Sequence, residues 1–293
     1  MKKEYLFYLL LFLVGCTEAI DIHTDNSEPV IVIYGTITDE IKQQEVRITR
    51  SSPYFDDKSN PSISGAKVTI TSSENKVYKL EEDESNPGYY RSLISWAAKV
   101  GVEYTLDVEV DFDDDGVMDN YQAATQILPT VTLDSIKIVP MTIMGHANYA
   151  LNIYGEEPPT EDFYLFKFNI NDSLYTKKIS QFIVSDDVMF SGQYINGITI
   201  NYFNDISEWE DDSDEQRKNS IYIKTGDKVE AQMSSVPKGY YDFIIQCWSE
   251  MNGENPMFGG PASNITTNIS NGGVGFFTGY CITRTSTEVK GYD

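Results

Sequence analysis

The sequence predicts a mainly β protein in two parts: an N-terminal immunoglobulin-like or transthyretin-like β-sandwich, then a second β-rich domain with one packed helix. Short runs of alternating polar and apolar residues recur along the chain, and Glu103 to Val110 is the clearest of them. Turn signals rich in Pro, Gly, Asn and Ser separate these runs. The 20 Tyr and 14 Phe among 293 residues are typical of a packed β-rich body and argue against disorder.

Residues 29–129 are predicted to form the β-sandwich. Val30 to Tyr34 indicates a buried strand, and two later runs, Glu45 to Thr49 and Lys67 to Thr71, alternate as half-buried strands do. About seven short strands in about 100 residues fit a sandwich of this size. Turn signals separate the strands at Ser51-Ser52-Pro53, Asn60-Pro61, Ser73-Glu74-Asn75 and Asn86-Pro87-Gly88.

Residues 130–293 are predicted to form the second domain, which starts after Leu128-Pro129. Strand-like alternation occurs over Thr132 to Val139, Tyr164 to Ile170 and Val229 to Met233. The Gly-rich and then aromatic stretch from Gly272 to Val289 indicates one closing strand.

One helix interrupts the β pattern of this second domain. Pro237 is placed to open it and Asn252-Gly253 to end it. Apolar residues recur between them at helical spacing: Tyr240, Phe243, Ile244, Cys247, Trp248 and Met251. We expect this stripe to face the core, in preference to a cofactor role.

The N-terminus predicts export and a lipid anchor. Lys2 and Lys3 precede an apolar stretch from Tyr5 to Val14, which is too short to span a bilayer but suits a signal peptide over residues 1–15. The sequence Leu13-Val14-Gly15-Cys16 resembles the bacterial lipobox. Cys16 would carry a thioether-linked diacylglycerol, and residues 16–28 would be the lipidated tether. An ordinary signal peptide or a buried cysteine is the alternative.

The acidic balance excludes some partners. The chain has a formal net charge of −23, and removal of Lys2, Lys3 and Glu4 with the signal peptide leaves −24. Such a charge repels phosphates and anionic lipid surfaces, so we expect no nucleic-acid partner.

One acidic segment resembles the start of a calcium loop. Asp111, Asp113 and Asp115 alternate ahead of Gly116, and Asp119 could act through water. The twelfth position is Gln122, where a bidentate carboxylate is expected. The segment also lies between two predicted strands, so a plain acidic hairpin turn is the alternative to a calcium cofactor.

Two further cysteines, Cys247 and Cys281, are the candidates for a disulfide. Export makes the bond chemically possible. Cys247 is equally compatible with the role of a small apolar core residue.

Motifs in a fixed order carry a resemblance to a known family. After the lipobox they are Val32-Ile33-Tyr34-Gly35, Arg50-Ser51-Ser52-Pro53-Tyr54-Phe55, Ile63-Ser64-Gly65-Ala66, Gly88-Tyr89-Tyr90-Arg91, Gly101-Val102-Glu103-Tyr104-Thr105-Leu106, Thr225-Gly226-Asp227, Asn255-Pro256-Met257-Phe258, Asn264, Asn268 and Gly272-Gly273-Val274-Gly275-Phe276-Phe277. In this order they resemble the domain of unknown function (DUF) 4249 family of Bacteroidota outer-membrane lipoproteins, over nearly the whole chain. The resemblance implies an N-terminal immunoglobulin-like domain, a C-terminal β domain, and association with TonB-dependent receptors. It brings no catalytic residues.

The residues themselves do not indicate an enzyme. The only histidines are His23, in the tether, and His146, and neither belongs to a known catalytic motif.

We therefore expect an outer-membrane binding or accessory module, partnered with a TonB-dependent receptor in nutrient capture. A surface adhesion or structural lipoprotein is the alternative. We expect the cell surface as its location, with the periplasmic leaflet as the alternative. The ligand, the partner's identity and the oligomeric state do not follow from the sequence.

Overall fold

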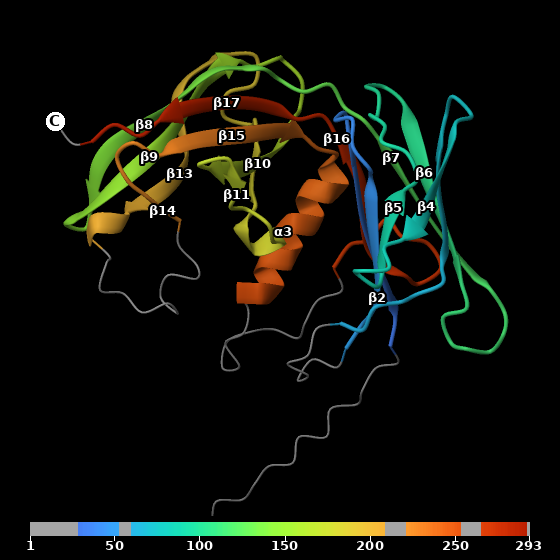
Figure 1. Ribbon diagram of the computed structural model, residues 1–293. Helices are drawn as coiled ribbons and strands as arrows, with labels where there is room; N and C mark the ends of the chain where they lie inside the picture. Colours follow the sequence, from blue (N-terminus) through green and yellow to red (C-terminus); the bar gives the residue numbers. More distant parts are fainter. Residues whose placement is uncertain (1–28, 53–59, 209–220, 253–264, 292–293) are drawn as a thin grey trace, which may run out of the picture.

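The computed structural model describes residues 29–52, 60–208, 221–252 and 265–291. These residues form three β-sheets and one long α-helix, which confirms the mainly β fold with a single packed helix (Figure 1). Within these ranges, no helix has the length and apolar character that crossing a membrane requires.

The first sheet contains eight strands in the order β16-β1-β2-β5-β4-β3-β6-β7. The strands are β1 (Ile31–Thr38), β2 (Glu45–Arg50), β3 (Lys67–Ser72), β4 (Val77–Glu82), β5 (Tyr89–Ser92), β6 (Glu103–Val110), β7 (Asp119–Gln126) and β16 (Val274–Tyr280). In β6 every second residue is buried, as the alternation of its sequence predicts.

The outermost strand of this sheet comes from the far end of the chain. β16 pairs in parallel with β1, from Val32 opposite Val274 to Thr38 opposite Tyr280. The stretch predicted as one closing strand is therefore two strands, β16 and β17 (Thr283–Glu288), which belong to different sheets. Residues near 270–281 thus complete the first part of the protein, although a division at residue 129 assigns them to the second.

The first sheet bends until its two edges are joined by side chains. The Asn268 side chain accepts a hydrogen bond from Phe277 N (2.9 Å) and donates to Ala124 O (3.1 Å), so it links β16 to β7. Gly279 N donates to Thr125 Oγ1 at 2.9 Å. The eight strands therefore form one continuous, nearly closed sheet around the core.

The core inside this sheet is apolar. Its buried side chains come from nearly every strand of the sheet and from the returning segment, and include Ile33, Ile37, Val46, Ile48, Ile70, Tyr90, Trp96, Tyr104, Leu106, Val108, Ile127, Ile269, Phe277 and Cys281. Burial of such residues supplies the main driving force for folding of this part.

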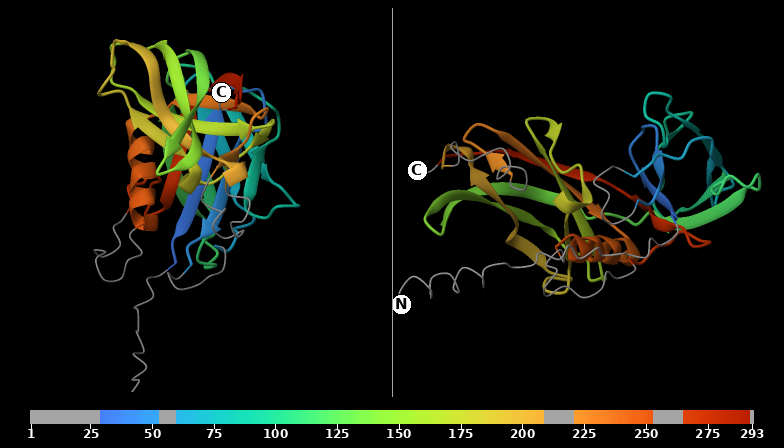
Figure 2. Two further views of the ribbon diagram at one scale, coloured as in Figure 1. Left: turned by 90° about the vertical axis from the view of Figure 1, so that its left-hand side faces the viewer. Right: turned by 90° about the horizontal axis from the view of Figure 1, so that it is seen from below.

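The second part consists of two sheets that enclose another apolar core (Figure 2). One has the order β11-β10-β15-β17, with β12 also paired to β10, and the other has the order β14-β13-β9-β8. Their strands, besides β17, are β8 (Leu133–Ile143), β9 (His146–Glu156), β10 (Phe163–Ile170), β11 (Ser173–Leu174), β12 (Ile183–Asp186), β13 (Tyr194–Asp205), β14 (Tyr222–Ile223) and β15 (Lys228–Ser235). The rings of Phe168 and Phe203 meet edge to face between the two sheets, with centroids 5.6 Å apart.

The helix α3 (Lys238–Asn252) joins the two parts. It follows Pro237 directly, as predicted, since proline suits the start of a helix but not its interior. The rings of Tyr240 and Phe243 pack against Phe276 of β16, with centroids 5.4 and 5.2 Å away. Their cluster also contains Leu165 of β10. In Figure 1 the helix lies between β10 and β16.

Candidate metal-binding sites

The predicted calcium segment forms the loop of a hairpin. Residues 111–118 connect β6 to β7, and the two strands pair from Val110 opposite Asp119. Asp114 (φ 60°) and Gly116 (φ 84°) have left-handed backbone conformations, which let the chain reverse.

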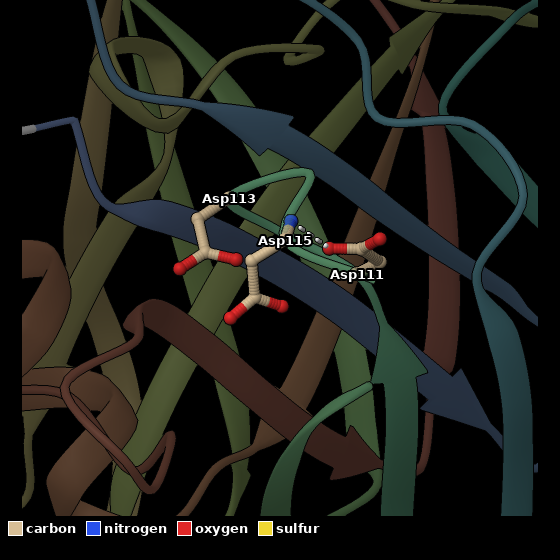
Figure 3. Close-up of side chains that lie close together, drawn as sticks. All are labelled: Asp111, Asp113 and Asp115. Carbon is tan, nitrogen blue, oxygen red and sulfur yellow. Dashed lines mark hydrogen bonds between the residues drawn. The ribbon is translucent and has the colours of Figure 1, made fainter. Parts of the chain in front are cut away.

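Three of the four predicted acidic ligands converge in this loop. One carboxylate oxygen each of Asp111, Asp113 and Asp115 lies within 4.8 Å of the other two (Figure 3). Asp111 accepts hydrogen bonds from the backbone N–H of Asp115 (3.1 Å) and of Gly116 (3.0 Å). Asp113 and Asp115 are exposed and Asp111 is half-buried. The loop therefore has local order, and it can be either a cation site or an acidic turn.

The other two positions of the predicted loop are used differently. Asp119 accepts a hydrogen bond from Phe112 N at 3.2 Å, so it fastens the base of the loop. The Gln122 amide donates to Asp107 on β6 at 2.5 Å, away from the three converging carboxylates. The structure thus groups Asp111, Asp113 and Asp115 and separates Asp119 and Gln122 from them.

A cationic side chain places the loop relative to the start of β1. The guanidinium of Arg50 donates to Phe112 O and lies 4.4 Å from the centroid of the Phe112 ring. Arg50 is the partner of Ile31, the first residue of β1. The acidic loop is therefore at the end of the sheet where the described chain begins.

A second acidic cluster, which the sequence did not indicate, lies in the other part of the protein. Glu157 directly follows β9, Asp162 directly precedes β10, and Asp187 directly follows β12. An oxygen of each lies within 4.8 Å of the others. Glu157 is only 4% exposed and Asp187 only 2%. Such burial is unusual for carboxylates.

The polar atoms of this cluster are only partly paired. The Tyr164 hydroxyl donates to Glu157 Oε1, and the Thr160 hydroxyl donates to Asp162 (2.6 Å). Glu157 Oε2 and Asp187 Oδ2 are buried and have no hydrogen-bond partner. Unsatisfied buried carboxylate oxygens carry a large desolvation cost.

The electrostatic surroundings of Glu157 are negative. Burial raises the pKa of its carboxyl to about 7, the hydrogen bond from Tyr164 opposes this increase, and the charges of Asp162 and Asp187 add to it. Within the described ranges, no lysine or arginine pairs with any of the three acids.

A small cavity lies on the other side of Tyr164, and none of the three acids lines it. Its volume is about 150 Å³, and apolar side chains of both sheets line it together with Tyr164. It is smaller than ordinary sites for organic ligands but can hold several water molecules.

The weak sequence signal of this cluster explains why it was missed. Its members are separated along the chain, and isolated acids are usually exposed. Glu157 follows the exposed Glu156, and Asp187 follows Asp186. Neighbouring residues of an extended chain point to opposite faces, so one acid of each pair can point inward. These two acidic pairs were the available signal in the sequence.

The remaining predicted sites have different outcomes. Cys16 lies outside the described residues, so its lipidation stays a prediction. Cys247 and Cys281 are free thiols in the structure, and they belong to different core clusters. Cys281 is a buried core residue, whereas Cys247 is partly buried and packs against its cluster. Burial raises the pKa of each thiol to about 11.

In the comparison with known proteins, the chain matched one family model. A family model described as a domain of unknown function, DUF4249, matches residues 17–286. No curated protein matches the chain.

Proposed function

The chain belongs to the DUF4249 family, and on that premise we propose that it is a lipid-anchored binding or accessory module of the bacterial outer membrane. Its proposed role is to assist a TonB-dependent receptor in nutrient capture at the cell surface. The protein holds a position next to the receptor and performs no chemistry of its own.

The observation that carries this proposal is the N-terminal pattern. Two lysines, an apolar stretch and Leu13-Val14-Gly15-Cys16 follow one another in the order that lipid attachment requires. The family match begins at residue 17, directly after Cys16. This supports a mature protein whose first residue is the lipidated cysteine.

The position of β1 shows which end of the first sheet follows the proposed tether. Residues 17–28 separate Cys16 from Pro29 and can reach at most about 45 Å. The end of the first sheet that carries Ile31 and Arg50 is next to this tether along the chain, and the acidic hairpin loop lies beside it.

The opposite end of the first sheet offers a surface for a partner. Its loops follow the C-terminal end of β1 and precede the first residue of β6. Four exposed apolar side chains lie in these loops: Ile41, Leu93, Ile94 and Val100. Exposed apolar groups that gather at one end of a domain suit a protein interface.

Two experiments test the proposal. The Cys16→Ala variant should leave the membrane fraction or accumulate as an uncleaved precursor, whereas wild-type behaviour would contradict the anchor. Chemical cross-linking in intact cells should trap a large outer-membrane receptor, and Ile41→Ser with Ile94→Ser should reduce the yield of that product.

A matched control separates the interface from general effects. Val117→Ser alters a similarly exposed apolar residue in the acidic hairpin loop, at the other end of the sheet, so it should leave the cross-link unchanged. Recovery of the lipoprotein without a partner, together with turnover of a glycan or peptide by the purified protein, would contradict the proposal. Recovery without a partner and loss of cell adhesion on gene deletion would favour the adhesion alternative.

A further inference from the structure

The cluster of Glu157, Asp162 and Asp187 combines features that a structural turn does not require. Two of the carboxyl groups, those of Glu157 and Asp162, come from the connection between β9 and β10, and that of Asp187 comes from the residue after β12. Glu157 and Asp187 are more than nine-tenths buried. Glu157 Oε2 and Asp187 Oδ2 have no partner. Since folding exposes these oxygens to each other and not to water, some positive species must compensate them.

The geometry points to a divalent cation, and we propose that these three carboxylates form a calcium-binding site between the two sheets of the second part. Calcium binds oxygen ligands at about 2.3–2.6 Å, so two oxygens on the same ion are at most about 5 Å apart. The three carboxylate oxygens satisfy this limit, because all lie within 4.8 Å of one another.

Calcium fits better than other small cations. The ligand set is all oxygen, and it comes from loop residues at the strand ends, which adapt to the irregular geometry that calcium accepts. Magnesium requires a near-ideal octahedron, and zinc prefers nitrogen or sulfur ligands, which these three acids do not supply.

The same acids could instead share a proton. One proton would bridge Glu157 and Asp187 but would leave the charge of Asp162 and one further negative charge uncompensated. A divalent cation neutralises two charges and satisfies both unpartnered oxygens. It would also connect the ends of β9 and of β10 and β12, which belong to different sheets.

The site can be tested on the detergent-solubilised full chain. After treatment with a chelator and its removal, 2 mM CaCl₂ should raise the melting temperature by about 3–6 °C. Terbium should bind with luminescence sensitised by Tyr164, because this ring lies next to the ligands. Calcium should compete for the terbium.

Isosteric variants show which of the two acidic clusters causes the response to calcium. Asp187→Asn and Glu157→Gln each remove one charge without loss of volume, so in chelator both variants should fold at least as well as wild type. Both should lose the rise in melting temperature with calcium and the terbium luminescence sensitised by Tyr164. Asp113→Asn, in the hairpin loop, is the matched control and should retain both responses. The proposal is overturned if the Asp187→Asn and Glu157→Gln proteins respond like wild type, if Asp113→Asn alone abolishes the response, or if wild type shows no response to calcium.

Discussion

The hydroxyl oxygens of Tyr34 in β1 and Tyr240 in α3 lie 2.6 Å apart. Tyr240 is fully buried, and burial raises the pKa of both phenols. The contact joins two residues separated by 206 positions in the chain. It connects the first sheet to the helix that also packs on the second part, so it reports on how tightly the two parts are held together.

A double-mutant cycle on this pair should reveal coupling. Tyr34→Phe and Tyr240→Phe should each lower the free energy of unfolding by about 1–2 kcal/mol, because each leaves the other hydroxyl without its partner. The double variant should lose no more than either single variant, since no unpaired group remains. Urea denaturation measures all four proteins, and additive losses would show that the hydrogen bond contributes nothing.

The parallel pairing of β1 and β16 depends on Gly275. Its φ is +104°, and a Cβ atom there would overlap the carbonyl oxygen of Ile33. Gly275→Ala should therefore destabilise the protein by more than about 3 kcal/mol.

Gly272 is a matched control for that substitution. Its φ is +75°, but a Cβ atom would meet nothing within 4 Å. Gly272→Ala should cost only the backbone strain of about 1 kcal/mol. Thermal unfolding compares the two variants, and similar losses would contradict the close approach of Gly275 to Ile33.

The raised pKa of Glu157 gives the chelated protein a specific pH dependence. Its folded pKa of about 7 exceeds the ordinary value of 4.5, so the folded state binds the proton more tightly than the unfolded state. The stabilisation is complete below about pH 4.5 and disappears as the pH rises through 7. The free energy of unfolding should fall by up to about 3 kcal/mol across this window.

The pH effect can be assigned with one variant. Glu157→Gln cannot titrate and should have a nearly flat stability between pH 5 and pH 8. A wild-type protein that gains stability over this range in chelator would show that Glu157 is ionised in the fold.

Calcium binding by the hairpin loop has to be measured in a variant whose cluster of Glu157, Asp162 and Asp187 no longer binds calcium. In Asp187→Asn protein, millimolar calcium should raise the melting temperature by about 2–4 °C if Asp111, Asp113 and Asp115 hold an ion. Asp113→Asn should abolish that rise, whereas Asp114→Asn, which alters an acid outside the cluster, should not. An unchanged melting temperature would leave only the acidic turn.

The thiols of Cys247 and Cys281 should be slow to react. With pKa values of about 11, their thiolate fraction at pH 8 is about 100-fold below that of an ordinary cysteine. Site-resolved mass spectrometry should find alkylation by iodoacetamide only after unfolding. Absence of alkylation in denaturant without reductant would reveal a disulfide.

Local periodicity predicted most of the individual elements. The observed bounds of β6 coincide with the predicted run, and α3 ends at Asn252 as the Asn-Gly signal indicated. The convergence of Asp111, Asp113 and Asp115 was also predictable, because the three acids belong to one short loop. In each case, the information lies within a few neighbouring residues.

Pairing between distant segments was not predictable in the same way. Alternation shows which face of a strand is buried but not which strand lies next to it, so the partnership of β16 with β1 left no local sign. The Glu157 cluster depends on the approach of the β9–β10 connection to the residue after β12, and the tertiary fold sets this approach. Its residues carry no spacing motif, and for that reason the sequence pointed only to the hairpin loop.

The position of β1 has a mechanical consequence. β1 is hydrogen-bonded along both sides, to β16 in parallel and to β2 in the antiparallel direction. A pull that enters through the residues before Ile31 acts along the strand, while its hydrogen bonds run across it. The load is therefore a shear that many bonds share at once, and they cannot open one after another. A chain tethered at this end would bear tension through the hydrogen bonds on both sides of β1.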